Sequence, residues 1–244
     1  MQIYRLTRGV PYQVIGNILQ LARANASKLS RFPVDADSPL IGIAEAEVHE
    51  KLGSALVFVE KPPLLDLGGE HIRGVSEVII AVDETVDNGR LAGFLQYKPR
   101  LPVCDSVSIG YAAVAEAYRR QGVLRQMMAE MLKHYPAAGL DCDLELVPLY
   151  EHLGFYVVGQ EGFHVAMENA PLSGKNWAMT LDELSSRESV IRAKDEVWKR
   201  LGNVKAKAAF RERTEMEKAA EARVAEFLTS RQVASPKSED RASA

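Results

Sequence analysis

The chain has 244 residues, 47% of them hydrophobic and 26% charged, which is typical of a soluble globular protein. It contains no apolar run long enough to cross a bilayer and no signal-peptide core, and its two cysteines are too few for a disulfide scaffold, so we expect a cytoplasmic protein with reduced thiols. The formal net charge of −3 argues against a general nucleic-acid-binding protein, so nucleic acid is not an expected partner.

The N-terminal half predicts two helices and a series of strands. Residues 2–7 alternate in polarity and predict a strand, and Pro11 suits the first position of a helix that follows. A second helix is expected to begin with Ser38 as its N-cap and to end at Gly53. Further strands are expected at 54–59, 75–82 and 91–97, with a loop at 64–74 and a turn at Asp87-Asn88-Gly89.

Residues 111–132, YAAVAEAYRRQGVLRQMMAEML, are the central stretch of the chain. A strand at 103–115 leads into a polar turn at 118–122, and apolar residues at helical spacing predict a helix at 123–135. The first turn of a helix has amides without internal partners and carries partial positive charge. Three arginines in this stretch add full charges, so the pattern predicts a phosphate-binding turn. The alternative is an ordinary strand-to-helix connection.

A second distinctive segment, LYEHLGF, occupies residues 149–155. A strand is expected before it at 142–147, a short helix at 148–153, and two closing strands within 155–167 around Gly159–Gly162. A βαβ unit in this half of the chain predicts a mixed α/β sheet.

Together, VAEAYRRQGVLRQMM and LYEHLGF resemble the GCN5-related N-acetyltransferase (GNAT) family over residues 1–169. Arg119 and Gly122 match the first two positions of that family's Gln/Arg-x-x-Gly-x-Gly/Ala motif, whereas Leu124 departs from the third. The resemblance implies an α/β fold with a mixed, mostly antiparallel sheet flanked by helices, here with a C-terminal helical extension. It also implies an acetyl-CoA-dependent N-acetyltransferase that transfers the acetyl group directly in a ternary complex.

The turn and the strand before it are the expected acetyl-CoA site. Backbone amides would hold the pyrophosphate, beside the charges of Arg119 and Arg120, and Gly122 allows close approach because it lacks a Cβ. These amides belong to Gln121, Gly122, Val123, Leu124 and Arg125. The resemblance further places Ala113, Val114 and Ala115 beside the pantetheine arm, although small residues also suit an ordinary core strand.

Tyr150 is the expected catalytic acid, because a phenol is protonated at neutral pH and can donate to a thiolate leaving group. The alternative is a tyrosine that only packs its helix. Glu145 is the expected general base and Asp105 the alternative. The five histidines show no spacing typical of a metal site, and we expect none.

The C-terminal part differs in character from the body. Residues 173–244 hold 15 of the 30 basic and 12 of the 33 acidic residues, so a weakly basic tail follows an acidic body. We expect a GNAT-like domain at 1–169, a linker at 170–179, a charged helical extension at 180–233 and a disordered tail at 234–244. Thr180 and Glu183 predict a capping box, and the seven-residue spacing of Leu184, Ile191 and Trp198 predicts one narrow apolar seam. This seam either packs on the body or contacts a second copy or a protein partner.

Two functions follow. The first is acetylation of a primary amine, either a small molecule or a protein lysine or N-terminus, and the acidic body favours a cationic amine. The alternative is a catalytically weak or inactive GNAT-like fold that serves as a binding or assembly module through its helical tail.

Overall fold

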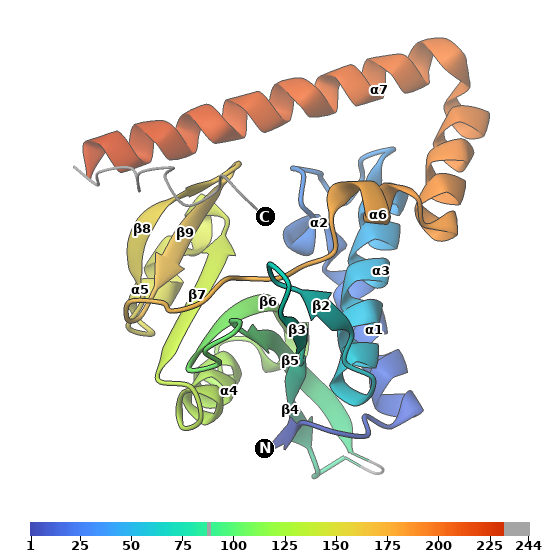
Figure 1. The fold of residues 1–244 in the computed structure, drawn as a ribbon. Helices are drawn as coiled ribbons and strands as arrows, with labels where there is room; N and C mark the ends of the chain where they lie inside the picture. The colour runs from blue at the N-terminus through green and yellow to red at the C-terminus, as the bar shows by residue number, and fades with distance from the viewer. Residues whose placement is uncertain (87–88, 232–244) are drawn as a thin grey trace.

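The computed structural model describes residues 1–86 and 89–231, and its centre is a seven-stranded mixed sheet (Figure 1). The sheet has the order β1-β4-β5-β6-β7-β9-β8. The strands are β1 Gln2–Leu6, β4 Glu77–Asp83, β5 Arg90–Pro99, β6 Ser106–Val114, β7 Ala137–Cys142, β8 Tyr156–Glu161 and β9 His164–Glu168. The pair β2 Leu64–Asp66 and β3 His71–Arg73 forms a separate hairpin.

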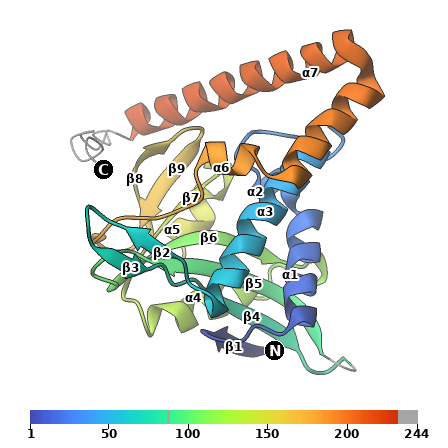
Figure 2. The ribbon, with the colours of Figure 1, turned by 45° about the vertical axis from the view of Figure 1, so that its right-hand side comes forward.

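Helices cover both faces of the sheet, as Figure 2 shows. On one face, α1 (Tyr12–Ala24) and α3 (Ile41–Glu60) pack on Val78, Ile80 and Phe94. On the other face, α4 (Val123–Leu132) packs on the alternate residues of the same strands, such as Ile79 and Leu95. This alternation follows from the two-residue period of a strand and makes two hydrophobic layers. The fold class expected from the sequence is confirmed.

The strands β6 and β7 form the only parallel pair among the described strands, and they stay together for a short distance. They pair at Ser106–Ala137, Val107–Ala138 and Ser108–Gly139. Beyond Ser108, β6 continues to Val114 with only β5 paired to it, while β7 continues to Cys142 beside β9. The two strands therefore diverge toward their carboxyl ends, which lead into α4 through the turn and into α5 (Val147–Glu151) through the 3₁₀ segment η2 (Leu144–Leu146).

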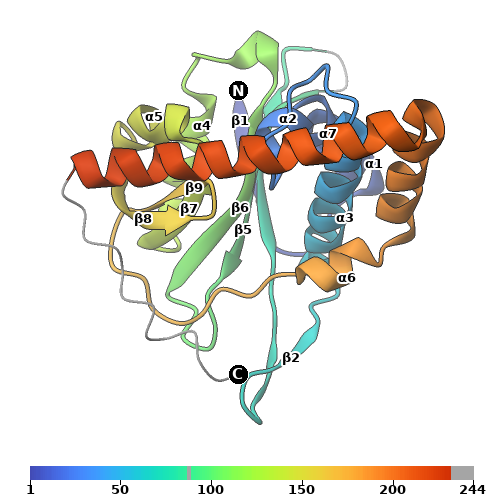
Figure 3. The same cartoon turned by 90° about the horizontal axis from the view of Figure 1, so that it is seen from above.

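A long helix, α7 (Glu188–Ser230), follows the short α6 (Leu181–Ser185) and crosses one end of the molecule (Figure 3). Gly202 interrupts the helical geometry with φ 70°, so α7 bends there. The part before the bend packs on α3, and the part after it reaches β8 and β9. The helix buries Val190, Val197, Ala206, Val224 and Leu228. Among the described residues, no helix has the length and apolar character needed to span a membrane.

Several predicted elements are wrong. The expected strand at 54–59 belongs to α3, because Ala55, Leu56 and Val59 continue the buried helical stripe of Val48 and Leu52. Strand β7 covers 137–142 and ends where the predicted strand at 142–147 would begin. Residues 64–74 contain a hairpin and not only a loop. Helix α3 begins at Ile41 with Leu40 as its N-cap, later than Ser38 predicts.

The predictions for the C-terminal part have mixed outcomes. The capping box of Thr180 and Glu183 is confirmed. The single seam is wrong, because the helix breaks after Ser185 and its phase changes: Leu184 is buried, whereas Ile191 is 46% exposed. Trp198 stacks on Phe210 of the same helix. The expected tail at 234–244 and the Asp87-Asn88 part of the predicted turn lie outside the described residues.

Candidate active site at the diverging strands

The turn before α4 has the backbone geometry of an anion-binding loop. Arg120 and Gly122 both have left-handed φ, at 62° and 75°, and Gly122 is the N-cap of α4. A Cβ built at Gly122 would meet nothing within 4 Å, so the space in front of this residue is free of protein atoms. The amide of Gln126 donates to the Gly122 carbonyl at 3.0 Å and begins the helical pattern. The three amides before it open the helix without intrahelical acceptors.

Arginines surround this turn and one of them fixes its position. The Nη2 of Arg119 donates to Oδ1 of Asn25 at 2.9 Å, and its Nε donates to the Val114 carbonyl at 3.3 Å. Arg120 and Arg125 are exposed. Arg119 therefore ties the turn to the end of α1, while the other two charges face solvent.

Leu124, which departs from the motif, does not obstruct the turn. Its side chain is partly buried and packs against the hydrophobic layer under α4. Val123 beside it is fully within this layer, at 2% exposure. The side chain at position 124 thus serves the core, and its amide stays in the first turn of α4 with those of Val123 and Arg125. The amide of Gln121 precedes the helix, and its side chain donates to the Ala117 carbonyl at 2.8 Å.

The end of β6 offers backbone groups to the gap between the strands. The amide of Ala115 donates to the Ala92 carbonyl at 2.8 Å and so points toward β5. Successive amides of a strand point in opposite directions, so the amide of Val114 faces the edge that β7 has left. Ala113 turns its side chain into the layer with α1 and α3, at 9% exposure. Of these three predicted residues, Val114 alone has an amide that the backbone directs toward the gap.

Tyr150 lies on α5, which follows β7, whereas the turn before α4 follows β6. It is 8% exposed, and its ring meets Phe155 edge to face with 6.0 Å between centroids. Burial raises the pKa of the Tyr150 phenol, and the nearby Cys142 thiol and Asp143 carboxylate raise it further. The phenol therefore keeps its proton throughout the physiological range, as a proton donor must.

The two carboxylates predicted as general bases, Glu145 and Asp105, lie at opposite ends of the β6–β7 pair. Glu145 follows β7 on η2, at the open end of the strands, with a side chain 74% exposed and 3.9 Å from Lys28 Nζ. Asp105 immediately precedes β6, at the end where the strands still pair, and accepts a hydrogen bond from the Ser173 hydroxyl. Of these two residues, only Glu145 lies at the same end of the strands as the turn.

Sequence reasoning missed Glu47 and Tyr111. Glu47 lies on α3 beside the buried Val48, and burial raises the pKa of its carboxyl despite the opposing charges of Lys194, Arg213, Lys51 and Arg31. Tyr111 lies on β6, where burial raises the pKa of its phenol. The available signal was the position of Glu47 within the predicted helix, next to the buried Val48 of its apolar stripe.

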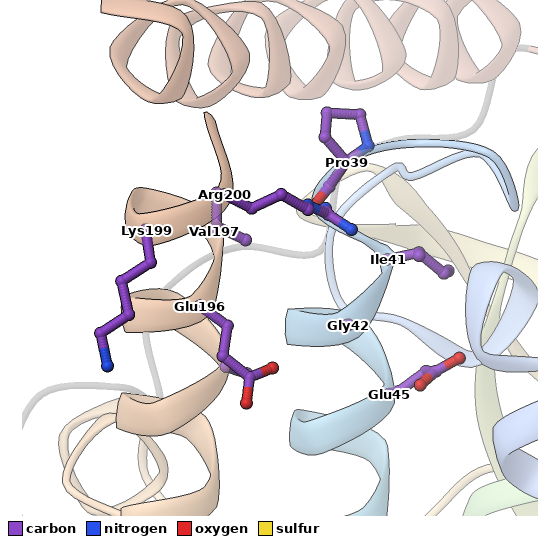
Figure 4. A pocket seen from close by; sticks show the side chains of 9 residues that line it. Pro39, Ile41, Gly42, Glu45, Glu196, Val197, Lys199 and Arg200 are labelled. Carbon is purple, nitrogen blue, oxygen red and sulfur yellow. The ribbon is translucent and has the colours of Figure 1, made fainter. Parts of the chain in front are cut away.

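A separate pocket lies where α3 and α7 cross (Figure 4). Ile41, Gly42 and Glu45 line it from α3, and Glu196 and Arg200 from α7. Arg200 closes one side by donating to the Pro39 carbonyl at 2.7 Å. The pocket shares no residue with the turn, β6 or α5, so it is separate from the candidate site.

The sequence and the structure were compared with known proteins. The model of the acetyltransferase (GNAT) family matches residues 47–155, which confirms the resemblance that the two motifs carry. No curated protein matches the sequence.

Among solved structures, the chain is similar to ElaA from Escherichia coli, with 19% identity, a TM-score of 0.44 and coverage of 70% of this chain and 100% of that one. It is similar to a GCN5-related N-acetyltransferase from Kribbella flavida, with 19% identity, a TM-score of 0.43 and coverage of 70% and 98%. It is also similar to an aminoglycoside 6'-N-acetyltransferase complexed with coenzyme A, with 15% identity, a TM-score of 0.44 and coverage of 71% and 99%.

Proposed function

From the premise that residues 47–155 are an acetyltransferase domain of the GNAT family, we propose that this protein transfers the acetyl group of acetyl-CoA to a primary amine. One observation carries the proposal. The parallel strands β6 and β7 lose their pairing after Ser108 and Gly139, at the end where the α4 amides open. A long, thin substrate with a pyrophosphate at one end and a thioester at the other suits this arrangement.

The pyrophosphate would lie on the turn before α4. The amides of Val123, Leu124 and Arg125 and the partial charge of the helix attract an anion, and Gly122 leaves room for it. Arg120 and Arg125 would add full charges from solvent-facing positions. The pantetheine arm would then follow β6, where the amide of Val114 hydrogen-bonds to the substrate.

The chemistry requires one bond to form and one to break. The neutral amine nitrogen attacks the thioester carbonyl carbon, the C–N bond forms, and the C–S bond breaks. The Tyr150 hydroxyl gives its proton to the departing thiolate, and its buried position keeps that proton available until this step. The proton that the nitrogen loses passes through water to Glu145 or to Glu47, and separate Gln substitutions would distinguish these two carboxylates.

Calorimetric titration with acetyl-CoA tests the proposal directly. Acetyl-CoA should bind, and S-acetylpantetheine, which lacks the phosphates, should bind at least about a hundredfold more weakly because it cannot use the turn. Release of the CoA thiol in the presence of an amine panel then measures turnover. Absence of acetyl-CoA binding would overturn the proposal. Binding without turnover on any amine would favour the alternative, a GNAT-like module without catalytic activity.

A further inference from the structure

A group of cationic side chains comes together from α3, β5, α7 and the segment before α3. We define the cationic cluster as Arg31, Lys51, Lys98 and Arg213. Lys51 comes from α3, Lys98 from β5 and Arg213 from α7, and Arg31 precedes α3. The charges of Arg31 and Lys98 both act on Lys51, and the charges of Arg31, Lys51, Arg213 and the neighbouring Lys194 of α7 act on Glu47. The cluster thus joins four segments that are distant in the sequence.

The cluster borders the strand that leads to the acetyl-CoA turn. Lys98 is opposite Ser108, the last residue of β6 that pairs with β7. Tyr111, further along β6, couples electrostatically to Arg31 and Glu47. The cluster therefore lies beside the stretch of β6 where the strands diverge, on the α3 side of the sheet.

The positive charge of the cluster exceeds the negative charge of the carboxylates near it. Within residues 1–86 and 89–231, no carboxylate lies within 4.0 Å of any of its four members. The charge of Glu47 acts on Lys51, whereas four cations (Lys194, Arg213, Lys51 and Arg31) act on Glu47, so the cations outnumber this carboxylate. Burial lowers the pKa of both Lys51 and Lys98 to about 8, so both still carry charge at neutral pH. By contrast, Arg5 at a partly buried site is paired with Glu77 at 2.7 Å.

Aromatic rings hold two of these cations in place without neutralising them. The Lys98 ammonium lies 4.2 Å from the ring centre of Trp177, and the Arg213 guanidinium lies 4.7 Å from that of Phe32. The Nε of Arg213 is buried and has no hydrogen-bond acceptor. A buried donor without an acceptor destabilises the protein, and a bound anion would supply the missing acceptor.

We propose that the amine acceptor carries an anionic group, a carboxylate or a phosphate, and that the cationic cluster binds it. This inference rests on the proposed acetyl transfer and adds the class of acceptor. It replaces the cationic amine that the net charge of the body favoured, because the local charge beside β6 is opposite in sign to the charge of the body as a whole. An anion held at Lys98 and Arg31 would leave the amine end of the acceptor free to approach the thioester, which the pantetheine arm would carry along β6.

The test begins with anion binding to the full chain saturated with CoA, so that the CoA phosphates occupy their own site. Phosphate should raise the melting temperature more than chloride at equal ionic strength. The rise should fall markedly in Lys98→Gln and in Arg31→Gln. Arg31 is exposed, so misfolding is a poor explanation for the effect of its substitution. The control Lys133→Gln removes an exposed lysine at the end of α4 and should behave as the wild type. An equal response to phosphate in wild type and both cluster variants would overturn the inference.

The second arm measures kcat/KM for matched acceptors, O-phosphoethanolamine against ethanolamine and glycine against glycinamide. The anionic member of at least one pair should be preferred by about tenfold, and Lys98→Gln should remove that preference. The pair that responds identifies phosphate or carboxylate as the anion. Preference for the uncharged members would overturn the inference while leaving acetyl transfer established. Absence of any CoA-induced thermal shift would overturn the proposed function instead. The phosphate titration of the free protein would still show whether the cationic cluster binds an anion.

Discussion

Arg119 donates a hydrogen bond to the side-chain oxygen of Asn25, 2.9 Å away, and so joins the turn before α4 to the end of α1. Asn25 also donates from Nδ2 to the Leu21 carbonyl at 2.8 Å, which fixes the amide that Arg119 contacts. The proposed phosphate site is therefore held in place by a residue far from it in the sequence.

We predict that Asn25→Ala will raise the KM for acetyl-CoA by about two- to tenfold, because the free energy of one net hydrogen bond corresponds to a change of that size in affinity. The kcat should stay nearly unchanged. Asn25→Asp keeps an acceptor for Arg119 and should retain a KM close to that of the wild type. Steady-state kinetics with acetyl-CoA as the varied substrate checks both variants. Equal KM values for all three proteins would show that the bond does not position the turn.

Gly122→Ala should lower both stability and acetyl-CoA affinity. The added Cβ meets no protein atom, but a left-handed φ costs a residue with a Cβ about 1–2 kcal/mol, and the methyl group would occupy the space proposed for the pyrophosphate. Gly16→Ala in the middle of α1 is the matched control, because its Cβ also meets nothing and its φ is not left-handed. It should be neutral or stabilising by up to about 1 kcal/mol. Denaturant unfolding and calorimetric titration together distinguish the two effects.

Tyr150→Phe should reduce kcat by about a hundredfold or more while KM values change little, because the hydroxyl acts only on the leaving group. The ring contact with Phe155 remains, so the melting temperature should change by only a few degrees. Tyr156→Phe is the control, since the Tyr156 hydroxyl bonds to Glu168 on the neighbouring strand. A Tyr150→Phe enzyme with wild-type kcat would show that this tyrosine only packs its helix.

The pH dependence of stability should reflect the two buried lysines. The pKa values of Lys51 and Lys98 are about 8 in the folded protein, below the ordinary lysine value of 10.5. Between about pH 8 and 10.5 the unfolded chain therefore binds more protons, and the free energy of unfolding should rise with pH in this window. The double variant Lys51→Met/Lys98→Met should lack this rise, and urea titrations of both proteins at pH 7, 8, 9 and 10 measure the difference. Parallel pH profiles would contradict the lowered pKa values.

Leu228→Ala on α7 should destabilise the protein by about 2–4 kcal/mol, because Leu228 is buried in the layer that also contains Tyr150 and Phe155. Val204→Ala on the same helix removes an 84% exposed side chain and should change stability by less than about 0.5 kcal/mol. Thermal unfolding of the two variants distinguishes a helix packed on its own body from one that binds a partner. Equal melting temperatures would favour the partner interpretation.

The sequence predicted best where short-range chemistry decides the structure. The turn from Tyr118 to Gly122, the start of α4 at Val123 and the capping box at Thr180 depend on neighbouring residues, and all three lie where their residue types indicate. The strand predicted at 54–59 failed because a short apolar run suits a buried strand and a buried helix equally well.

The cationic cluster was beyond sequence reasoning for a different reason. Its members come from four segments, and neither Lys98 nor Arg213 has a local pattern that distinguishes it from a solvated side chain. Tertiary packing alone brings them together. The roles of the predicted site residues, the division into domains and the cytoplasmic location stay predictions.

One half of helix α7 packs on α3, and the other half packs on β8 and β9. These two sets of contacts lie on opposite sides of the diverging strands. The two sides cannot move apart or together unless one set of these contacts gives way. Helix α7, which carries none of the groups proposed to react, thus joins the two sides of the gap and limits how far they can separate.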